Sequence, residues 1–298
     1  MMTNSKVAVI IVNWKKYDIT LCCIESILNS TNSNFKIILV DNESDNKKVK
    51  KFKYRNEIKI IRNKENEGFS KANNIGIDYA LKNKYDYTIL INNDTIVEKN
   101  LIEVLLKTAQ AKNFSVVQPL ILKYNGKEIW NAGGRINYFF GNFITRKKVN
   151  NSLNSSDELI EWLTGCCCLF KTKIFKEIGK LDESFFAYYE DIDFSLRLKK
   201  HGYKIGFTSK THVYHYESFS SISNNSKGGK LSPYIHYLNI RNHILILKKH
   251  SDLFNPFGTR LYQIFKIISY SIYFIFRLRF TKLNKVYKGL LDSYKIKI

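Results

Sequence analysis

The chain has 298 residues, 44% of them hydrophobic, which is enough to bury one large core or two small ones. Only 14 glycines and 3 prolines occur, so collagen-like and proline-rich disordered chains are excluded. The net charge of +22 implies attraction to an anionic partner, which is a nucleic acid, a phosphorylated ligand or an anionic membrane. A compositional bias toward Lys, Asn and Ile along the whole chain is the alternative explanation of that charge.

The first part of the chain alternates strands with helices. The expected strands are apolar runs at residues 7–12, 36–40, 58–61 and 87–91. A helical pattern follows the first strand, a short charged helix precedes the third, and a turn at residues 65–69 opens another helix before the fourth. This alternation predicts an α/β fold with a doubly wound, mostly parallel sheet.

The chain is less regular after residue 117. Residues 118–161 are expected to form short strands and a polar loop. The remaining expected elements are a buried strand at 162–170, a helix at 190–201, a short strand at 204–207, a loop at 218–232 and a helix from Pro233 to about residue 250. The tail at residues 261–280 is apolar and aromatic, but charged residues interrupt it, so a membrane span is not indicated.

The five cysteines fall in two clusters, at residues 22–23 and 166–168. Neighbouring cysteines form strained bridges at best, and the chain has no C-x-x-C pair with metal-binding spacing. Both clusters lie in apolar stretches, which predicts buried, reduced thiols. The apolar run near the N-terminus is too short for a secretory signal, so a cytoplasmic location is expected.

Polar side chains follow the fourth expected strand at the point where it ends. Asp94 can supply a carboxylate to a hard divalent cation, and Asn92 and Asn93 offer amides to a ribose or a metal-bound water. The carboxyl edge of such a sheet is where α/β proteins hold ligands. The alternative is an Asx-turn that caps the next helix.

Three carboxylates, those of Glu190, Asp191 and Asp193, are packed into the start of the helix at 190–201. Acids stabilise a helix N-terminus, but three exceed what capping needs. The aromatic residues at 185–189 would desolvate at least one of them and raise its pKa toward the range of a general base.

Four single residues complete the candidate site. Asp41, at the end of the second strand, can accept a hydrogen bond from a nucleobase, and Trp14 can stack on the same base. His215 complements Asp94 as a metal ligand, and Arg241 can pair with a diphosphate. The first three have a structural alternative, because a turn-capping Asp, a core Trp and a structural His are all common.

Taken in order, these motifs resemble glycosyltransferase family 2, which has the GT-A fold, and within it the bacterial rhamnosyltransferase-like branch. The resemblance covers about residues 6 to 245 and rests on the segments VDNESD, NEGFSKANNIG, LINNDT, TGCCCLF, GKLDESFFAYYEDIDFSLRLKKHGY, VYH and IRN. Each segment is weak evidence alone, and their common order is the strong signal.

The resemblance implies a role for each matching residue. Val12, Trp14 and Asp41 correspond to nucleobase contacts, and Gly68 and Asn74 lie in the segment that backs the nucleotide. The ends of the family's D-x-D motif fall on Asn92 and Asp94, so metal coordination by Mn²⁺ or Mg²⁺ depends mainly on Asp94. Asp191 falls on the catalytic base with Glu190 beside it, and His215 falls on an additional metal or phosphate contact. The family inverts the anomeric carbon in a single displacement.

The sequence therefore predicts a metal-dependent inverting glycosyltransferase of cell-envelope polysaccharide biosynthesis. It would move a hexosyl or deoxyhexosyl group from a UDP- or dTDP-sugar to a surface glycan or lipid-linked acceptor. The GT-A domain is expected at residues 1–250, with a nucleotide-sugar half to about 117 and an acceptor half from 118. A basic nucleic-acid-binding protein and an inactive scaffold of the same fold are the alternatives. The aromatics sit mainly in apolar strands or beside acids, so no nucleic-acid partner is expected.

The tail at residues 251–298 is predicted to be an amphipathic helical extension. A stripe at helical spacing is formed by Leu261, Phe265, Ile268, Ile272, Ile275 and Phe276. Such a stripe packs on the catalytic domain or makes peripheral contact with an anionic membrane, helped by Arg277, Arg279 and Lys282. In the second case the protein works at the inner face of the plasma membrane.

Overall fold

The computed structural model describes residues 5–43, 52, 56–149, 157–216 and 231–296. It has two compact units. The first comprises Met1–Arg135, Thr145–Phe186 and Glu190–Glu217, and the second comprises Ile136–Ile144, Ala187–Tyr189 and Ser218–Ile298. The division into a catalytic domain at 1–250 and a tail at 251–298 stays a prediction.

The first unit is built on a sheet that has ten strands among the described residues. Its main path runs β10-β12-β6-β11-β4-β1-β2-β3, with β5 paired to β12 and β7 paired to β6. The strands are β1 (Val7–Asn13), β2 (Phe35–Asn42), β3 (Ile58–Asn63), β4 (Tyr87–Asn92), β5 (Thr95–Val97), β6 (Val116–Lys123), β7 (Ile129–Asn131), β10 (Asp157–Leu159), β11 (Cys167–Lys171) and β12 (Ile205–His215). The strands β3, β2, β1 and β4 are mutually parallel, whereas β11 runs antiparallel to both of its neighbours.

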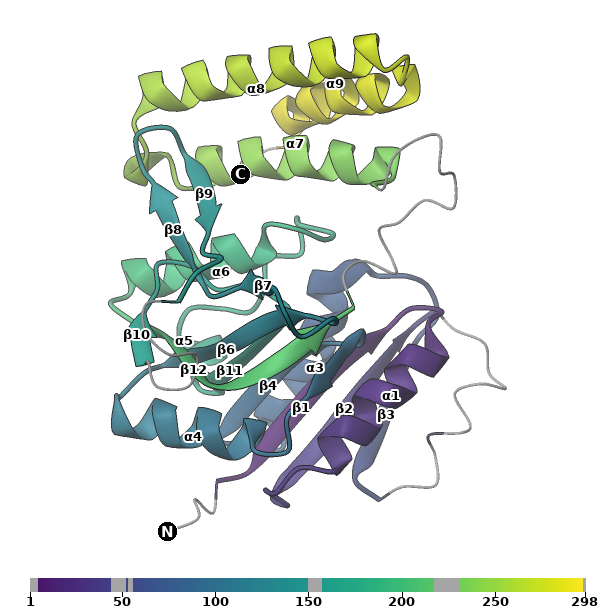
Figure 1. Cartoon of the computed structure of the whole chain (residues 1–298), viewed down its shortest axis with the longest axis vertical. Helices are drawn as coiled ribbons and strands as arrows, with labels where there is room; N and C mark the ends of the chain where they lie inside the picture. Colours follow the sequence, from purple (N-terminus) through teal and green to yellow (C-terminus); the bar gives the residue numbers. More distant parts are fainter. Residues whose placement is uncertain (1–4, 44–51, 53–55, 150–156, 217–230, 297–298) are drawn as a thin grey trace. The chain divides into compact units, whose positions relative to one another are not determined.

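Helices cover both faces of this sheet because its strands are apolar on both sides (Figure 1). In β1, Ala8 and Ile10 pack with α3 (Gly68–Lys82), α5 (Ile174–Glu177) and α6 (Glu190–Lys200). The alternate residues Val9 and Ile11 pack with α1 (Tyr17–Leu28) and α4 (Leu101–Ala111). Successive side chains of a strand point to opposite faces, so this alternation produces two cores. The expected α/β, mostly parallel architecture is confirmed.

Several expected elements differ in extent. Instead of short strands, residues 116–123 and 205–215 form two long strands, β6 and β12, that pair in parallel across a register shift between Thr208 and His212. These strands were not predicted at full length because buried polar residues interrupt their apolar pattern. Gln118, for example, is fully buried, and its amide donates to Asn131. The strand expected at 162–170 begins only at Cys167. The charged helix before β3 and most of the loop at 218–232 lie outside the described residues.

The cysteines are free thiols, and four of the five are buried. Burial raises the pKa of Cys23 to about 12 and raises the pKa of Cys166 and Cys168 well above its usual range. Cys22 is exposed, which corrects the expectation that both clusters are buried. The reason is the rotation of α1, which buries Thr20, Cys23, Ile24 and Ile27 and leaves position 22 outside that face.

The second unit is mainly helical. It contains α7 (Pro233–Lys249), the short 3₁₀ turn η3 (Ser251–Leu253), α8 (Pro256–Phe276) and α9 (Phe280–Lys295). A small hairpin, β8 (Gly134–Asn137) and β9 (Asn142–Thr145), has its tip in this unit. Ile240, Ile244, Phe274 and Val286 form the buried centre of the three helices. The tail divides into two helices, α8 and α9, a break that was not predicted. No helix among the described residues is long and apolar enough to cross a membrane.

Candidate active site

Asp94 and His215 lie against each other, although 120 residues separate them in the chain. Asp94 follows β4, and His215 is the last residue of β12, which is longer than the short strand expected at 204–207. Because β5 pairs with β12 and places His215 opposite Thr95, the two side chains meet, with His215 Nε2 3.2 Å from Asp94 Oδ1. Both residues are buried.

This pair fits a divalent cation that takes only part of its shell from the protein. The carboxylate is a suitable donor for a hard ion such as Mg²⁺ or Mn²⁺, which usually completes its shell with water and substrate phosphates, whereas imidazole is preferred by softer divalent ions. His215 Nδ1 is buried without a hydrogen-bond partner among the described residues. The described part of the chain holds no cluster of three or more His, Cys, Asp or Glu side chains suited to a metal.

A chain of hydrogen bonds links the carboxyl ends of β2, β1 and β4. The fully buried Asp41 carboxylate accepts from Asn13 at 3.0 Å, and Thr20 donates to Asn13 at 2.8 Å. The amide of Asn93 in turn donates to Thr20 at 2.8 Å. Arg62 reaches the other oxygen of Asp41 at 3.4 Å. Sequence reasoning missed Asn13 and Thr20, although a polar residue ending an apolar strand is the signal that selected Asn92.

Two further predicted residues lie beside this network. Val12, next to the end of β1, is half-buried and pairs with Val40 and Asn92 on the neighbouring strands. Trp14 follows β1 and is 40% exposed, with the ammonium of Lys15 5.5 Å from the centre of its ring. The indole is partly exposed next to the polar strand edge, and its stacking on a base stays a prediction.

Gly68 and Asn74 act on the segment that precedes the acidic helix. Gly68 has φ of +81°, and a Cβ there would lie 2.6 Å from the Phe186 carbonyl oxygen, so glycine is needed at this position. The amide of Asn74 donates to the Leu181 carbonyl at 2.8 Å and accepts from the Leu181 N–H at 3.0 Å. These contacts give both residues a positioning role, and a direct nucleotide contact stays a prediction.

The three acids at the start of α6 have different surroundings. Asp193 is fully buried and pairs with Arg197 at 2.8 Å, so its charge is already neutralised. Glu190 is buried, and its Oε2 has no partner among the described residues. Burial raises the pKa of Glu190 well above its usual range, and the charge of Asp191 adds to that effect. Of the three, Asp193 therefore serves structure.

Asp191 is half-buried and held in place by backbone N–H groups. Its Oδ2 accepts from Gly165 at 2.9 Å, and its Oδ1 accepts from Ile192 at 2.8 Å. Burial raises the pKa of this carboxyl, although the two N–H groups oppose the shift. The carbonyl oxygen of Cys166, the residue after Gly165, accepts a hydrogen bond from the backbone N–H of Asn92 at 2.8 Å. Residues 165–166 thus connect the candidate base with the turn that carries Asp94.

The family model described as "Glycosyl transferase family 2" matches residues 8–179, more than half of the chain. The chain belongs to glycosyl transferase family 2. The match includes both ends of the hydrogen-bonded network and the segment at residues 165–166, and it stops before the acidic helix.

Curated relatives of this family 2 chain are glycosyltransferases. The low-salt glycan biosynthesis hexosyltransferase Agl10 of Haloferax volcanii is 28% identical over 203 residues, which are 67% of this chain and 63% of that protein. The rhamnosyltransferase WbbL of Escherichia coli K12 is 26% identical over 163 residues, or 50% of this chain and 61% of its own. The matches thus span less than two thirds of these relatives.

Solved structures agree on the GT-A fold. The GalNAc-T7 structure with UDP, GalNAc and Mn²⁺ has a TM-score of 0.63 at 18% identity, covering 74% of this chain and 45% of that one. Residues 1–349 of S. aureus TarS with UDP-GlcNAc have a TM-score of 0.61 at 15% identity, covering 97% of this chain and 80% of that one. At these identities the likeness concerns the fold alone.

The IRN segment of the family 2 resemblance lies on α7 in the second unit. Arg241 donates from Nε to Asn242 Oδ1 at 2.8 Å, and its guanidinium lies 5.7 Å from the ring centre of Tyr237. Asn242, which sequence reasoning missed, donates to the carbonyls of Ala187 and Tyr188. Tyr188 has a left-handed backbone, with φ of 68°, which costs about 1–3 kcal/mol. Asn242 therefore helps to hold a strained segment, and the diphosphate contact of Arg241 stays a prediction.

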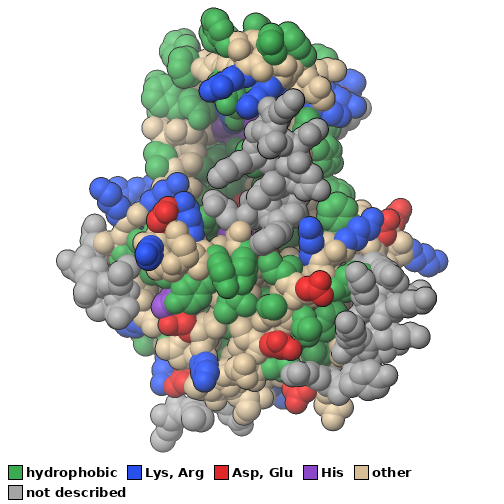
Figure 2. Space-filling model, turned by 45° about the vertical axis from the view of Figure 1, so that its right-hand side comes forward, with side chains coloured by type: hydrophobic (Ala, Val, Ile, Leu, Met, Phe, Trp, Pro, Cys, Tyr) green, Lys and Arg blue, Asp and Glu red, His purple; other side chains and the backbone are tan. Residues whose placement is uncertain are grey.

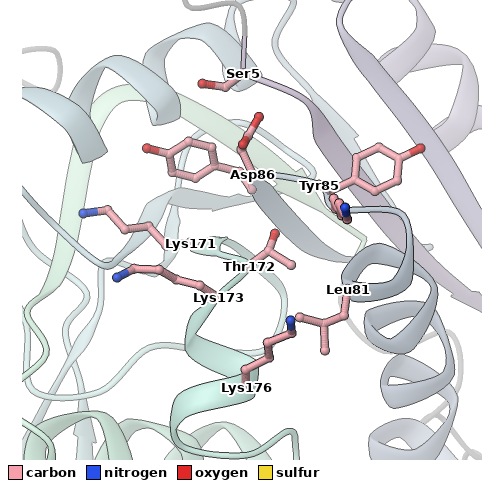
Figure 3. A pocket seen from close by; sticks show the side chains of 10 residues that line it. Ser5, Leu81, Tyr85, Asp86, Lys171, Thr172, Lys173 and Lys176 are labelled. Carbon is pink, nitrogen blue, oxygen red and sulfur yellow. The ribbon is translucent and has the colours of Figure 1, made fainter.

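A cavity of about 500 Å³ lies away from the candidate family 2 site. Figure 3 shows its lining, which includes Asp86, Lys171, Thr172 and Lys173. Asp86 immediately precedes β4, and Lys171 ends the antiparallel β11, so this cavity opens at the amino edge of the parallel strands. The candidate site is at the opposite, carboxyl edge, which is where α/β sheets hold ligands.

Replacing Glu190 with Gln should stabilise the protein at neutral pH. Because the pKa of Glu190 is raised in the folded state, stability is fullest below the ordinary value of 4.5 and falls as pH rises toward the folded pKa. Gln does not have to be protonated or desolvated as a carboxylate on folding, so we expect a gain of about 1–3 kcal/mol. Urea unfolding of both proteins across pH is the measurement. A difference that grew toward acid pH would contradict the raised pKa.

Proposed function

We propose that this family 2 protein is a metal-dependent inverting glycosyltransferase. Its donor would be a nucleoside diphosphate sugar, with UDP or dTDP, and its acceptor a hydroxyl group of a bacterial surface glycan or lipid-linked intermediate. The observation that carries the proposal is that residues 165–166 are hydrogen-bonded both to the half-buried Asp191 and to Asn92, the end of β4 that precedes the Asp94–His215 pair. The rhamnosyl- and hexosyltransferases among its relatives support this donor class.

In the proposed reaction Asp191 is the general base. A sugar hydroxyl has too high a pKa to attack unaided, so its proton passes to the carboxylate as its oxygen approaches the anomeric carbon. The new carbon–oxygen bond forms while the bond to the diphosphate breaks, and the nucleoside diphosphate leaves. Burial supports this role because it makes the Asp191 carboxylate a stronger proton acceptor. One base without an enzyme nucleophile implies inversion.

The other residues bind and orient the donor in this proposal. Asp41 and Trp14 recognise the nucleobase with Val12, while Asn92 and Asn93 contact the ribose side. Arg241 pairs with the diphosphate. Asp94 and His215 would hold Mn²⁺ or Mg²⁺, which when bound offsets the negative charge that develops on the leaving diphosphate. Gly68 and Asn74 keep the segment before α6 in position.

The proposed location is the cytoplasm or the inner face of the plasma membrane. A lipid-linked acceptor is confined to a membrane, so peripheral contact with an anionic bilayer belongs to the same proposal. The positive charge of the chain supports attraction to such a surface.

Donor binding tests the proposal through thermal stability. One member of a panel of UDP-, dTDP- and GDP-sugars with Mn²⁺ should raise the melting temperature, because a ligand at a hundredfold its Kd adds about 2.7 kcal/mol. Asp94→Ala should lose the Mn²⁺-dependent part of this shift and slow transfer, and His215→Ala should do so more mildly.

Asp78→Ala is the matched control for these variants. Asp78 is an exposed aspartate that pairs with Lys180, and its loss should leave the Mn²⁺-dependent shift intact. Full transfer activity in the presence of EDTA would contradict the metal-dependent mechanism. The absence of a shift with every donor in the panel would contradict the proposed function.

A further inference from the structure

The orientation of α8 is fixed by polar side chains that point inward. Lys266 Nζ lies 2.8 Å from His243 Nδ1 on α7, and Gln263 Nε2 lies 3.1 Å from the same atom. His243 Nε2 lies 2.6 Å from the Gly141 carbonyl oxygen, so Nε2 carries the proton and Nδ1 accepts. Burial lowers the pKa of Lys266 to about 8. The helix therefore turns its polar side toward α7.

The opposite side of α8 is apolar and exposed over the whole helix. The outer face, as we call it, comprises Leu261, Phe265, Ile268, Ile272, Ile275 and Phe276. Their exposed fractions run from 49% for Leu261 to 83% for Phe276. Figure 2 shows hydrophobic side chains gathered over α8, with Lys and Arg side chains nearby. Soluble proteins rarely expose a continuous apolar surface of this kind unless it binds something. Among the described residues this stripe is not used as core.

The charged residues of α8, and those of α9 before Asp292, are all cations. No Asp or Glu occurs between Asp252 and Asp292, a stretch that contains all of α8 and most of α9. Arg260 is exposed near the start of α8, and Arg277 is exposed directly after its end. Cations at both ends of an apolar stripe complement a surface that is apolar inside and anionic at its boundary, which is the chemistry of an anionic lipid layer.

We propose that α8 lies in the headgroup layer of an anionic membrane, with its outer face toward the acyl chains and Arg260 and Arg277 on lipid phosphates. The helix lies in the plane of the interface and does not span it, in keeping with its charged ends and inward polar side. This inference deepens the membrane contact of the proposed function and rests on that function for the identity of the acceptor. Its test involves no sugar transfer.

Co-sedimentation of the full chain with lipid vesicles tests the proposal. We expect binding to phosphatidylglycerol vesicles that weakens at high salt, and much weaker binding to phosphatidylcholine vesicles. The double variant Phe265→Gln/Ile268→Gln should lower the affinity by about tenfold or more. Arg260→Gln and Arg277→Gln should each lower it by about fivefold at low salt.

A matched control keeps this result specific. The side chains of Ile144 and Leu159 are 50% and 60% exposed, fractions similar to those of Ile268 and Phe265. Both residues lie outside the helices of the second unit. The double variant Ile144→Gln/Leu159→Gln should bind vesicles like the wild type. All variants should keep the circular dichroism spectrum and melting temperature, because the replaced side chains are exposed.

Three results would overturn the proposal: no binding of the wild type to anionic vesicles, equal binding to neutral vesicles, or unchanged binding of Phe265→Gln/Ile268→Gln. Sedimentation velocity tests the competing possibility, in which a second copy of the chain covers the outer face. A wild-type dimer that this double variant dissociates, together with an absence of vesicle binding, would assign the outer face to a second copy of the chain. Donor binding is measured separately, so a failure of the lipid proposal is distinct from a failure of the proposed function.

Discussion

Replacing Asp191 by Asn should slow sugar transfer by about 10²–10⁴-fold and leave donor binding nearly unchanged. The amide keeps the shape of the carboxylate and can still accept from the Gly165 N–H, but it cannot take the proton of the acceptor. Single-turnover rates at saturating acceptor, combined with the donor-induced thermal shift, separate the two effects.

The neighbouring acid Glu190 provides the control. Glu190→Gln should retain more transfer than Asp191→Asn, because Glu190 is assigned no proton in the reaction. Its buried, unpartnered oxygen makes it the competing candidate. Near-normal turnover of Asp191→Asn, with a large loss in Glu190→Gln, would move the role of base to Glu190. Near-normal turnover of both variants would remove it from this helix.

Arg197→Met should destabilise the protein by about 3–5 kcal/mol. Asp193 is fully buried and pairs with Arg197 at 2.8 Å, so the variant leaves a carboxylate inside the core without its partner. The same guanidinium donates to the carbonyls of Ile178 and Lys180 at 2.7 Å and lies 4.7 Å from the Phe194 ring centre. Chemical denaturation at neutral pH measures the loss.

A double variant separates the buried charge from the other contacts. Asp193→Leu/Arg197→Met removes both charges and should be less destabilised than Arg197→Met alone, although the carbonyls of residues 178 and 180 still lose their donor. Lys107→Met removes a cation from an exposed pair with Glu103 and should cost about 1 kcal/mol or less. A cost of that size for Arg197→Met would mean that Asp193 is protonated or reached by water.

The parallel part of the fold could be predicted because its strands are buried on both faces. Residues 7–12, 36–40 and 87–91 are continuous apolar runs, and their limits agree with β1, β2 and β4 to within two residues. The strands β6 and β12 were less visible, since each places polar residues inside. In β12, Thr208, Ser209 and Thr211 are buried around the register shift, and such a stretch has no apolar periodicity.

The candidate site was predictable one residue at a time but not as a set of contacts. Strand ends identified Asp94 and Asp41, and charge density identified Asp191. The contact between Asp94 and His215 depends on β5 pairing with β12, a long-range pairing that spacing does not encode. Ser195 was also missed: its hydroxyl donates to the Asp191 carbonyl one turn earlier in α6, and its Oγ accepts from the Leu163 N–H, a long-range contact that the sequence pattern does not show.

The segment at residues 165–166 sets a limit on how such an enzyme can be redesigned. Gly165 donates to Asp191 at 2.9 Å and Cys166 accepts from Asn92 at 2.8 Å, so a shift of this backbone would displace both the candidate base and the end of β4 that precedes Asp94. Among the described residues, no other loop is hydrogen-bonded to both Asp191 and Asn92. We therefore expect that exchanging other loops at the carboxyl edge, with residues 164–166 unchanged, changes the sugar preference and leaves the position of Asp191 relative to β4 intact.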